Sequence, residues 1–357
     1  MRNPMCRTLV WLSVLLQITS LFASANTSIH TSWLWHLHQP IYWTNRAPLN
    51  HFGDHYQNAW DSIQQQDDGS IVPTDPIAST FGDANRVQDY QNYPHDALSS
   101  IDVSQAPNSG AQVNYSGALM ENVQSLAQGD PSMGYSTTWY SGDQQAHTWT
   151  TTNGKTRLDL TNFTYHHCIA PFVSDETLEM DILIHQRQQQ IFWGSGATNL
   201  ISRGYFPAET CFSERIIPTL QKLGITWSVV GNNHLTRSCA DFPQVMILGS
   251  GGENCDIPNL ADQINPAQGT SSYTTRSISV GCSPTATAPF AYQMHYARYV
   301  DPASGEASTI IVVPADQALS WDDSYSTWDL SLMAPIAAAK ASSMKPGSAR
   351  MCQSGAT

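Results

Sequence analysis

The stretch from Ser32 to Tyr42 constrains the fold of this chain most strongly. It reads Ser-Trp-Leu-Trp-His-Leu-His-Gln-Pro-Ile-Tyr. Because side chains alternate between the two faces of a strand, Leu34, His36 and His38 would share one face. A proline then ends such a strand directly after the histidines. In α/β barrels the functional side chains gather at the carboxyl ends of the strands. We therefore expect a polar, aromatic-lined pocket to begin here.

Other segments predict helices and strands in alternation. Apolar residues recur at helical spacing in residues 111–126 and 178–193, and again in residues 213–224, where Ser213 would cap the helix and a glycine would end it. In residues 178–193, Met180, Ile184, Ile191 and Phe192 would form the apolar face. Residues 225–230 and 308–313 are typical of buried strands. Strands that alternate with helices predict an α/β fold with a mostly parallel sheet.

The N-terminus has the pattern of a secretory signal peptide. Arg2 and Arg7 supply the positive start, residues 9–22 are apolar, and residues 23–25 have small residues at the first and third positions. We therefore interpret residues 1–25 as a signal peptide and expect the protein to be secreted and extracellular.

The remaining chain is predicted to form one domain at residues 26–335, followed by a poorly patterned tail at 336–357. The whole sequence carries 16 basic and 29 acidic residues. Such a charge repels nucleic acid and anionic lipid, so we expect neither nucleic acid nor, after signal cleavage, a membrane as partner. Only 13% of the residues are charged, well below the roughly 25% of typical soluble domains. Amides and aromatic rings in their place suit a neutral sugar ligand.

Three motifs in order resemble the signatures of glycoside hydrolase family 57, of the α-amylase and amylopullulanase type. The first is His-Gln-Pro at 38–40, the second Tyr-His-His-Cys-Ile-Ala-Pro at 165–171, and the third Gly-Tyr-Phe-Pro-Ala-Glu-Thr-Cys-Phe-Ser at 204–213. The resemblance extends from about Trp33 to about Trp321. It implies an irregular (β/α)7 barrel that acts on α-glucans as a retaining hydrolase without a cofactor.

The resemblance assigns roles to individual residues. Glu209 occupies the position of the family's nucleophile, and the positive end of the following helix would keep its carboxylate ionised. Retaining enzymes use two carboxyl groups about 5–5.5 Å apart. Imidazoles and amides can bond sugar hydroxyls, and aromatic rings can stack on sugar faces. The expected substrate-binding residues are His36, His38, Gln39, Tyr42, His166, His167, Phe206 and His234.

The partner acid has no clear counterpart in the sequence. In the family it is an aspartate in a late signature that resembles Leu-Asp-Gly-Glu-Asn, and no such run is present. Residues 312–321 resemble the segment that precedes it. Asp316 is our candidate for the acid, with Asp322 and Asp323 as substitutes. We expect the barrel to be incomplete at its C-terminal end and the activity to be weak or lost.

Two other functions remain open at this stage. One is a non-catalytic carbohydrate-binding barrel. The other is a metal-dependent polysaccharide deacetylase, because His36, His38, His166 and His167 could ligate zinc. The sequence has no obvious Asp-Asp pair near the first histidines, and the leading interpretation requires no metal. The oligomeric state is not predicted.

Overall fold

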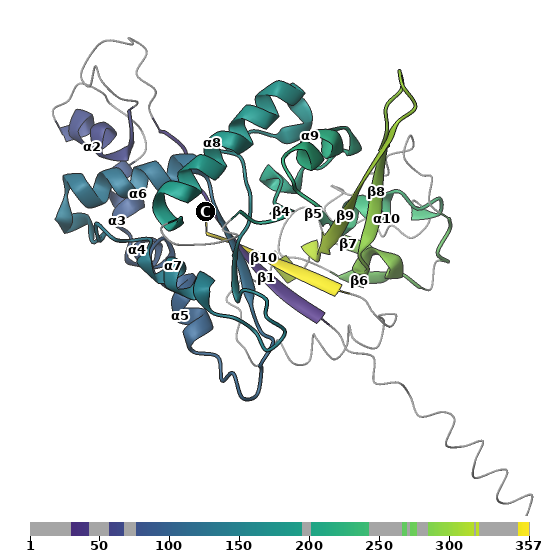
Figure 1. Ribbon diagram of the computed structural model, residues 1–357, viewed down its shortest axis with the longest axis horizontal. Coiled ribbons are helices and arrows are strands. Elements are labelled where there is room, and N and C mark those ends of the chain that lie inside the picture. Colours follow the sequence, from purple (N-terminus) through teal and green to yellow (C-terminus); the bar gives the residue numbers. More distant parts are fainter. Residues whose placement is uncertain are drawn as a thin grey trace, which may run out of the picture.

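A computed structural model describes residues 30–42, 57–67, 76–194, 201–242, 266–269, 272–276, 285–317, 319–320 and 349–356. Its centre is a parallel sheet (Figure 1). The parallel strands are β1 (His30–Leu37), β2 (Ala111–Tyr115), β3 (Leu158–Leu160), β4 (Gly204–Tyr205), β5 (Trp227–Gly231), β9 (Ala307–Ala315) and β10 (Ala349–Ala356). Their spatial order is β3-β2-β1-β10-β9-β5-β4, and β8 (His295–Val300) pairs antiparallel with β9.

The two ends of this sheet meet. A parallel bridge joins Asn162, just after β3, to Tyr205 of β4. The backbone N–H of Asn162 donates to the carbonyl of Gly204 at 3.1 Å, and that of Phe206 donates to the carbonyl of Asn162 at 3.0 Å. The parallel strands therefore form a ring in the order of the sequence. This confirms the irregular (β/α)7 barrel.

Strand β10 pairs extensively with one neighbour and only briefly with the other. Its pairing with β1 covers eight register positions, whereas its pairing with β9 consists of the single pair Met351 and Ala315. The expected incompleteness of the barrel at its C-terminal end corresponds to this short pairing between β10 and β9. The prediction for residues 336–357 missed the strand itself, because β10 pairs through its backbone and its sequence lacks a clear strand pattern. Residues 1–25, Asp322 and Asp323 lie outside the described residues.

Helices surround the ring (Figure 1). Those of the N-terminal half gather on one side, with α8 and α9 along the top of the view and α10 on the other side. The bounds are α2 (Ala59–Asp67), α3 (Ile77–Gly82), α4 (Ala84–Asp89), α5 (Tyr93–Ser99), α6 (Gly117–Gly129), α7 (Ser141–Thr148), α8 (Asp175–Trp193), α9 (Ile217–Lys222) and α10 (Asn232–Arg237). Two short strands, β6 (Thr274–Arg276) and β7 (Thr285–Thr287), form a separate antiparallel pair.

The predicted helix at 111–126 was wrong in its first part. Residues 111–115 form β2, and the helix α6 begins only after Ser116, whose side chain accepts a hydrogen bond from the N–H of Leu119. Val113 and Leu119 are both fully buried, one on each element. Their spacing in the sequence resembles that of one apolar helix face, although Val113 lies in a strand and Leu119 in a helix.

The helix predicted at 178–193 is confirmed as α8, but its buried face differs from the prediction. Its exposed residues include Met180, Ile184 and Ile191, whereas Asp181, His185 and Gln189 are buried. These polar side chains point inward because they donate hydrogen bonds to carbonyls at the ends of strands. His185 Nε2 donates to the carbonyl of Tyr115 at 2.8 Å, and Gln189 Nε2 donates to that of Leu160 at 3.2 Å. These bonds satisfy backbone groups that would otherwise be buried without partners.

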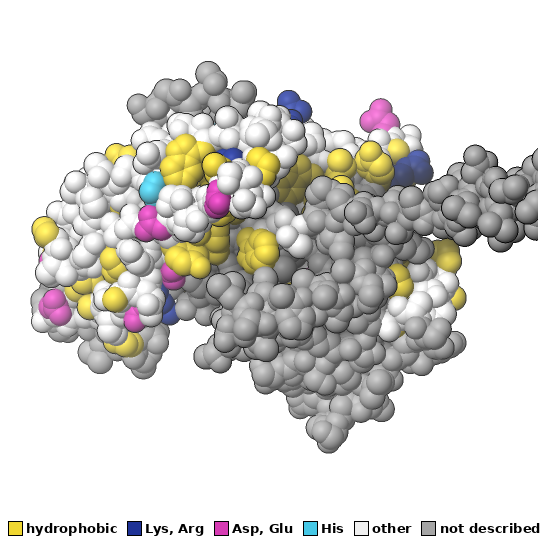
Figure 2. Space-filling view, turned by 90° about the horizontal axis from the view of Figure 1, so that it is seen from below, with side chains coloured by type: hydrophobic (Ala, Val, Ile, Leu, Met, Phe, Trp, Pro, Cys, Tyr) yellow, Lys and Arg dark blue, Asp and Glu magenta, His cyan; other side chains and the backbone are white. Residues whose placement is uncertain are grey.

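The strand alternation predicted for β1 is confirmed. Leu34 belongs to the cluster inside the ring, with Phe163, Phe206 and Val229, whereas Leu37 packs in the outer cluster against the helices. Among the described residues, no helix is both long and apolar enough to cross a membrane. Figure 2 shows mostly uncharged side chains on the described part of one face, with scattered acidic and basic groups.

Candidate active site

The carboxyl ends of the first four strands meet at one rim of the ring. His38 follows β1, Ser116 follows β2, His167 follows β3 and Glu209 follows β4. In a parallel ring all carboxyl ends lie on the same side, so the loops after neighbouring strands are adjacent. The structure thus brings the three sequence motifs together at this rim.

His36 forms the base of the site. Its Nδ1 donates to Asn114 Oδ1 at 2.7 Å, so its Nε2 is the acceptor and lies 3.3 Å from His167 Nε2. The ring centroid of His36 lies 4.8 Å from that of Phe163 and 5.0 Å from that of Phe206. These two aromatic rings form an apolar floor beneath the imidazole.

His38 and His167 stack above this base. Their ring centroids are 3.9 Å apart with an interplanar angle of 23°. His38 Nδ1 is 2.8 Å from Ser116 Oγ. Within the described chain, no hydrogen bond to His38 Nε2 is found.

Glu209 completes the group. Its Oε1 lies 3.5 Å from His167 Nε2, and 70% of its side chain is exposed. His167 and Glu209 both have left-handed backbones, with φ of 59° and 57°, and Thr210 has a φ of 53°. Such conformations cost of order 1–3 kcal/mol for residues with a Cβ and cluster at functional sites. Here they turn the imidazole and the carboxylate toward each other.

Asp181 of α8 anchors the loop that carries His167. Its Oδ1 accepts from His166 Nδ1 at 2.5 Å, and its Oδ2 accepts from the His166 backbone N–H at 3.2 Å. Burial is the larger cause of a raised pKa at the Cys168 thiol. Together with the Asp181 carboxylate it raises this pKa to about 12. His166 is therefore held beside the cleft by a side chain that the sequence motifs do not include.

Sequence reasoning missed Asn114, Ser116 and Asp181. Asp181, His185 and Gln189 follow one another at intervals of four on α8, and this polar stripe was a usable signal. Asn114 and Ser116 alternate on one face at the end of β2, as His36 and His38 do on β1. The prediction of a helix over these residues concealed that pattern.

Burial makes the imidazoles of this site poor bases. It lowers the pKa of His36 to about 4 and that of His38 to about 3, with the nearby His167 as a further cause. Burial also lowers the pKa of His167, against the opposing effect of Glu209. At neutral pH the rings are therefore uncharged. Since His36 Nε2 is an acceptor, His167 Nε2 carries the hydrogen and donates it to His36, and Glu209 Oε1 lies 3.5 Å from the same nitrogen.

Two of the predicted substrate contacts are buried. Phe206 is completely buried, so its ring supports His36 and was wrongly assigned to stacking. Gln39 is 5% exposed, donates to Tyr90 Oη at 3.1 Å and accepts from the hydroxyl of Tyr42. Through this bond Gln39 and Tyr42 brace the loop after β1, but Tyr42 is only half-buried, so its assignment to sugar stacking stays a prediction.

Asp316 and His234 lie at the same rim but further round the ring, after β9 and β5. Asp316 is 1% exposed, and its Oδ1 accepts from the backbone N–H of Leu319 at 3.1 Å, as a helix-capping residue does. His234 is half-buried on α10.

The described residues contain no group of three or more His, Cys, Asp and Glu side chains that could hold a metal ion. His38 and His167 stack face to face. Stacked rings do not direct their nitrogen lone pairs at one central point, as the tetrahedral zinc geometry requires.

Comparison with known proteins agrees with this geometry. A family model described as glycosyl hydrolase family 57 matches residues 32–263, a range that contains Glu209 and all the histidines of the rim group. The chain belongs to glycosyl hydrolase family 57. An alpha-amylase of Niallia circulans is 34% identical over 264 residues, which are 72% of this chain and 20% of that protein. The family 57 chain described here thus spans about a fifth of the length of this curated relative.

Solved structures of low identity also resemble the chain. The 4-alpha-glucanotransferase from Thermococcus litoralis is 11% identical, with 92% of this chain and 33% of that chain covered and a TM-score of 0.48. A family 57 branching enzyme from Thermococcus kodakaraensis is 8% identical, with coverages of 91% and 64% and a TM-score of 0.41. The barrel assignment of this family 57 chain rests on its own strand order.

The lowered imidazole pKa values predict a loss of stability in mild acid. In the unfolded chain a histidine has a pKa near 6.5, so between about pH 6.5 and 4 the unfolded state binds more protons than the folded state. Stability is therefore full above pH 6.5 and falls as the pH drops, by about 1–2 kcal/mol for each buried imidazole by pH 5. Urea unfolding at pH 7 and pH 5 of the parent and of His36→Gln measures this.

The variant should lose less stability over this interval than the parent, whatever its stability at pH 7. An identical pH dependence of the two proteins would contradict the lowered pKa of His36.

Proposed function

We propose that this protein is a secreted retaining glycoside hydrolase of α-glucans in which Glu209 is the nucleophile. The observation that carries the proposal is the exposed Glu209 carboxylate, 3.5 Å from His167 Nε2. It stands at the carboxyl ends of the barrel strands, in a left-handed turn. Family membership and the similarity to an alpha-amylase support the α-glucan substrate.

The site supplies the nucleophile for the first chemical step. An oxygen of Glu209 attacks the anomeric carbon, so that a glycosyl ester bond forms while the glycosidic carbon–oxygen bond breaks and the departing oxygen takes a proton from water. The exposure of Glu209 to water keeps its carboxylate ionised before the attack. A water molecule later cleaves the ester and releases the sugar with its original anomeric configuration.

The neutral histidines fit the binding of an uncharged sugar. His38 Nε2 can donate to or accept from a hydroxyl, and the exposed ring of His166, fixed by Asp181, precedes His167 on the same loop. The aromatic floor below excludes water from the underside of the site. An ionised imidazole is not required for either role.

Replacement of Glu209 by Gln should abolish turnover while binding persists. The amide keeps the size of the side chain but cannot attack, so we expect kcat on maltooligosaccharides to fall by about a thousandfold or more. Glu214→Gln is the matched control, since Glu214 is also exposed and only five residues further along the chain. Glu209→Gln activity equal to that of the control would rule out the assignment.

We further propose that protonation of the leaving group is the weak step in this 357-residue chain. The family's late aspartate signature has no counterpart in the sequence. General acid assistance is commonly worth about a hundredfold to ten-thousandfold. The burial of Asp316 and its capping bond to Leu319 favour a structural role for this carboxylate.

Rates on substrates with different leaving groups measure how weakly the chain protonates the leaving group. Aryl maltooligosides with a good leaving group need little protonation, so we expect their hydrolysis to exceed that of unactivated maltooligosaccharides by about a hundredfold or more. Asp316→Asn keeps a helix-capping residue and should leave this ratio unchanged. If Asp316→Asn instead slows only the unactivated substrates, Asp316 is the acid and the proposed weakness is wrong.

A further inference from the structure

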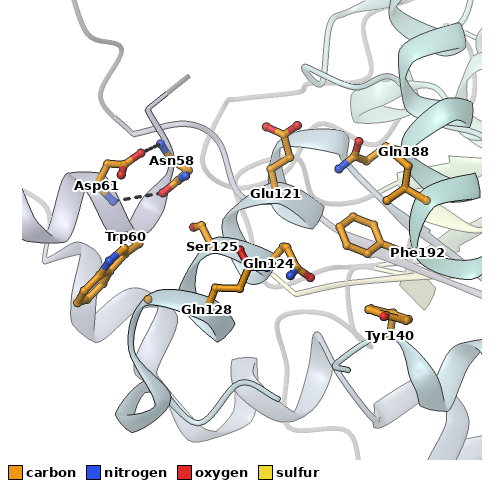
Figure 3. A pocket seen from close by; sticks show the side chains of 12 residues that line it. Asn58, Trp60, Asp61, Glu121, Gln124, Ser125, Gln128, Tyr140, Gln188 and Phe192 are labelled. Atoms are coloured by element: carbon orange, nitrogen blue, oxygen red, sulfur yellow. Dashed lines mark hydrogen bonds between the residues drawn. The ribbon is translucent and has the colours of Figure 1, made fainter. Parts of the chain in front are cut away.

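A cavity of about 850 Å³ lies on the outer wall of the barrel, between α2, α6 and α8 (Figure 3). In this view Asn58, Asp61 and Trp60 stand on one side and Gln188 and Phe192 on the other, with residues of α6 between them. The volume is within the range of about 300–1,000 Å³ that small-molecule sites occupy.

This cavity is separate from the Glu209 site. Helix α6 begins at the rim, where Ser116 contacts His38, and Gln124 lies eight residues further along. At 1.5 Å per residue that is about 12 Å down the helix, away from the rim. Gln188 lies seven residues beyond Asp181 on α8, about 10 Å by the same measure.

Several polar groups of the lining are not used to hold the fold. Among the described residues, the side chains of Glu121, Gln128, Gln188 and Tyr140 have no hydrogen-bond partner. They come from α6, from α8 and from the residue before α7. By contrast, Asn58 and Asp61 bond each other's backbone N–H groups at the start of α2 and so stabilise that wall.

Apolar surfaces complete the lining. The indole of Trp60 packs over Gly129 so closely that a Cβ there would lie 2.3 Å from the ring. Tyr140 and Phe192 contact each other with ring centroids 5.4 Å apart, and Ile191 is 57% exposed. Such surfaces can cover the apolar face of a sugar ring while the amides reach its hydroxyls.

The charge of the lining selects among ligands. The lining residues include the carboxylates of Asp61 and Glu121 and no lysine or arginine, so an anionic ligand would be repelled. We propose that this cavity is a second, non-catalytic binding site for a short neutral glucan. The choice of an α-linked glucan rests on the proposed function, whereas the existence of a separate sugar site does not.

Calorimetric titration of maltoheptaose into Glu209→Gln protein tests the proposal. We expect two classes of site in this background. Adding Gln128→Ala and Gln188→Ala should weaken one class at least tenfold and leave the other unchanged, because these two side chains only line the cavity. The matched control adds Gln145→Ala and Gln190→Ala, two exposed glutamines on α7 and α8 outside the cavity, and should keep both classes.

The same pair of substitutions in the otherwise unchanged protein should leave kcat/KM on a short aryl maltooside unaltered. Retention of both binding classes in the Gln128→Ala and Gln188→Ala protein would overturn the second site. Loss of both classes would overturn it too, because the cavity would then be coupled to the catalytic cleft. Failure of Glu209 as nucleophile would instead appear in turnover, so the two proposals fail separately.

Discussion

The closure of the barrel at Asn162 is the constraint on which the site depends. Besides the two backbone bonds between the ends of the sheet, Asn162 Nδ2 donates to the carbonyls of Ser202 at 2.6 Å and Gly204 at 2.9 Å. The loop after β3 is thereby fixed beside the loop after β4. His167 and Glu209 meet only because these loops are adjacent. Gly204 also leaves room for the ring of Trp227 on the neighbouring strand β5, since a Cβ at position 204 would lie 2.0 Å from that ring.

The surroundings hold the backbone strain in place at His167 and Glu209. Asp181 binds the loop before His167 through two hydrogen bonds, and the stack with His38 fixes the imidazole itself. Relaxation of either left-handed residue would separate the Glu209 carboxylate from the His167 ring nitrogen that lies 3.5 Å away. The polar inner face of α8 therefore bonds both the His166 loop of the site and carbonyls at the strand ends. Because these polar residues face inward, Met180, Ile184 and Ile191 face solvent.

The sequence predicted the parts of the fold that follow from local periodicity. The alternation in β1 correctly placed Leu34 and His36 inside the ring, because a strand of period two leaves no other arrangement. The buried face of α8 was only partly predictable from apolarity. Phe192 is buried as expected, but His185 and Gln189 also point inward, where they bond carbonyls of distant strands. Phe206 was misassigned because burial cannot be seen in the sequence. An aromatic residue close to a proposed nucleophile suggests a stacking surface, but Phe206 is completely buried.

Covalent trapping tests the central claim most directly. A fluorinated glucosyl fluoride that slows the second step should leave a glycosyl ester on the nucleophile, which intact mass and peptide mapping can locate. The account predicts the mass of one fluorosugar on the peptide that contains Glu209, and no adduct in Glu209→Gln. An adduct on another carboxylate, or turnover of the reagent with inversion and without an adduct, would contradict it.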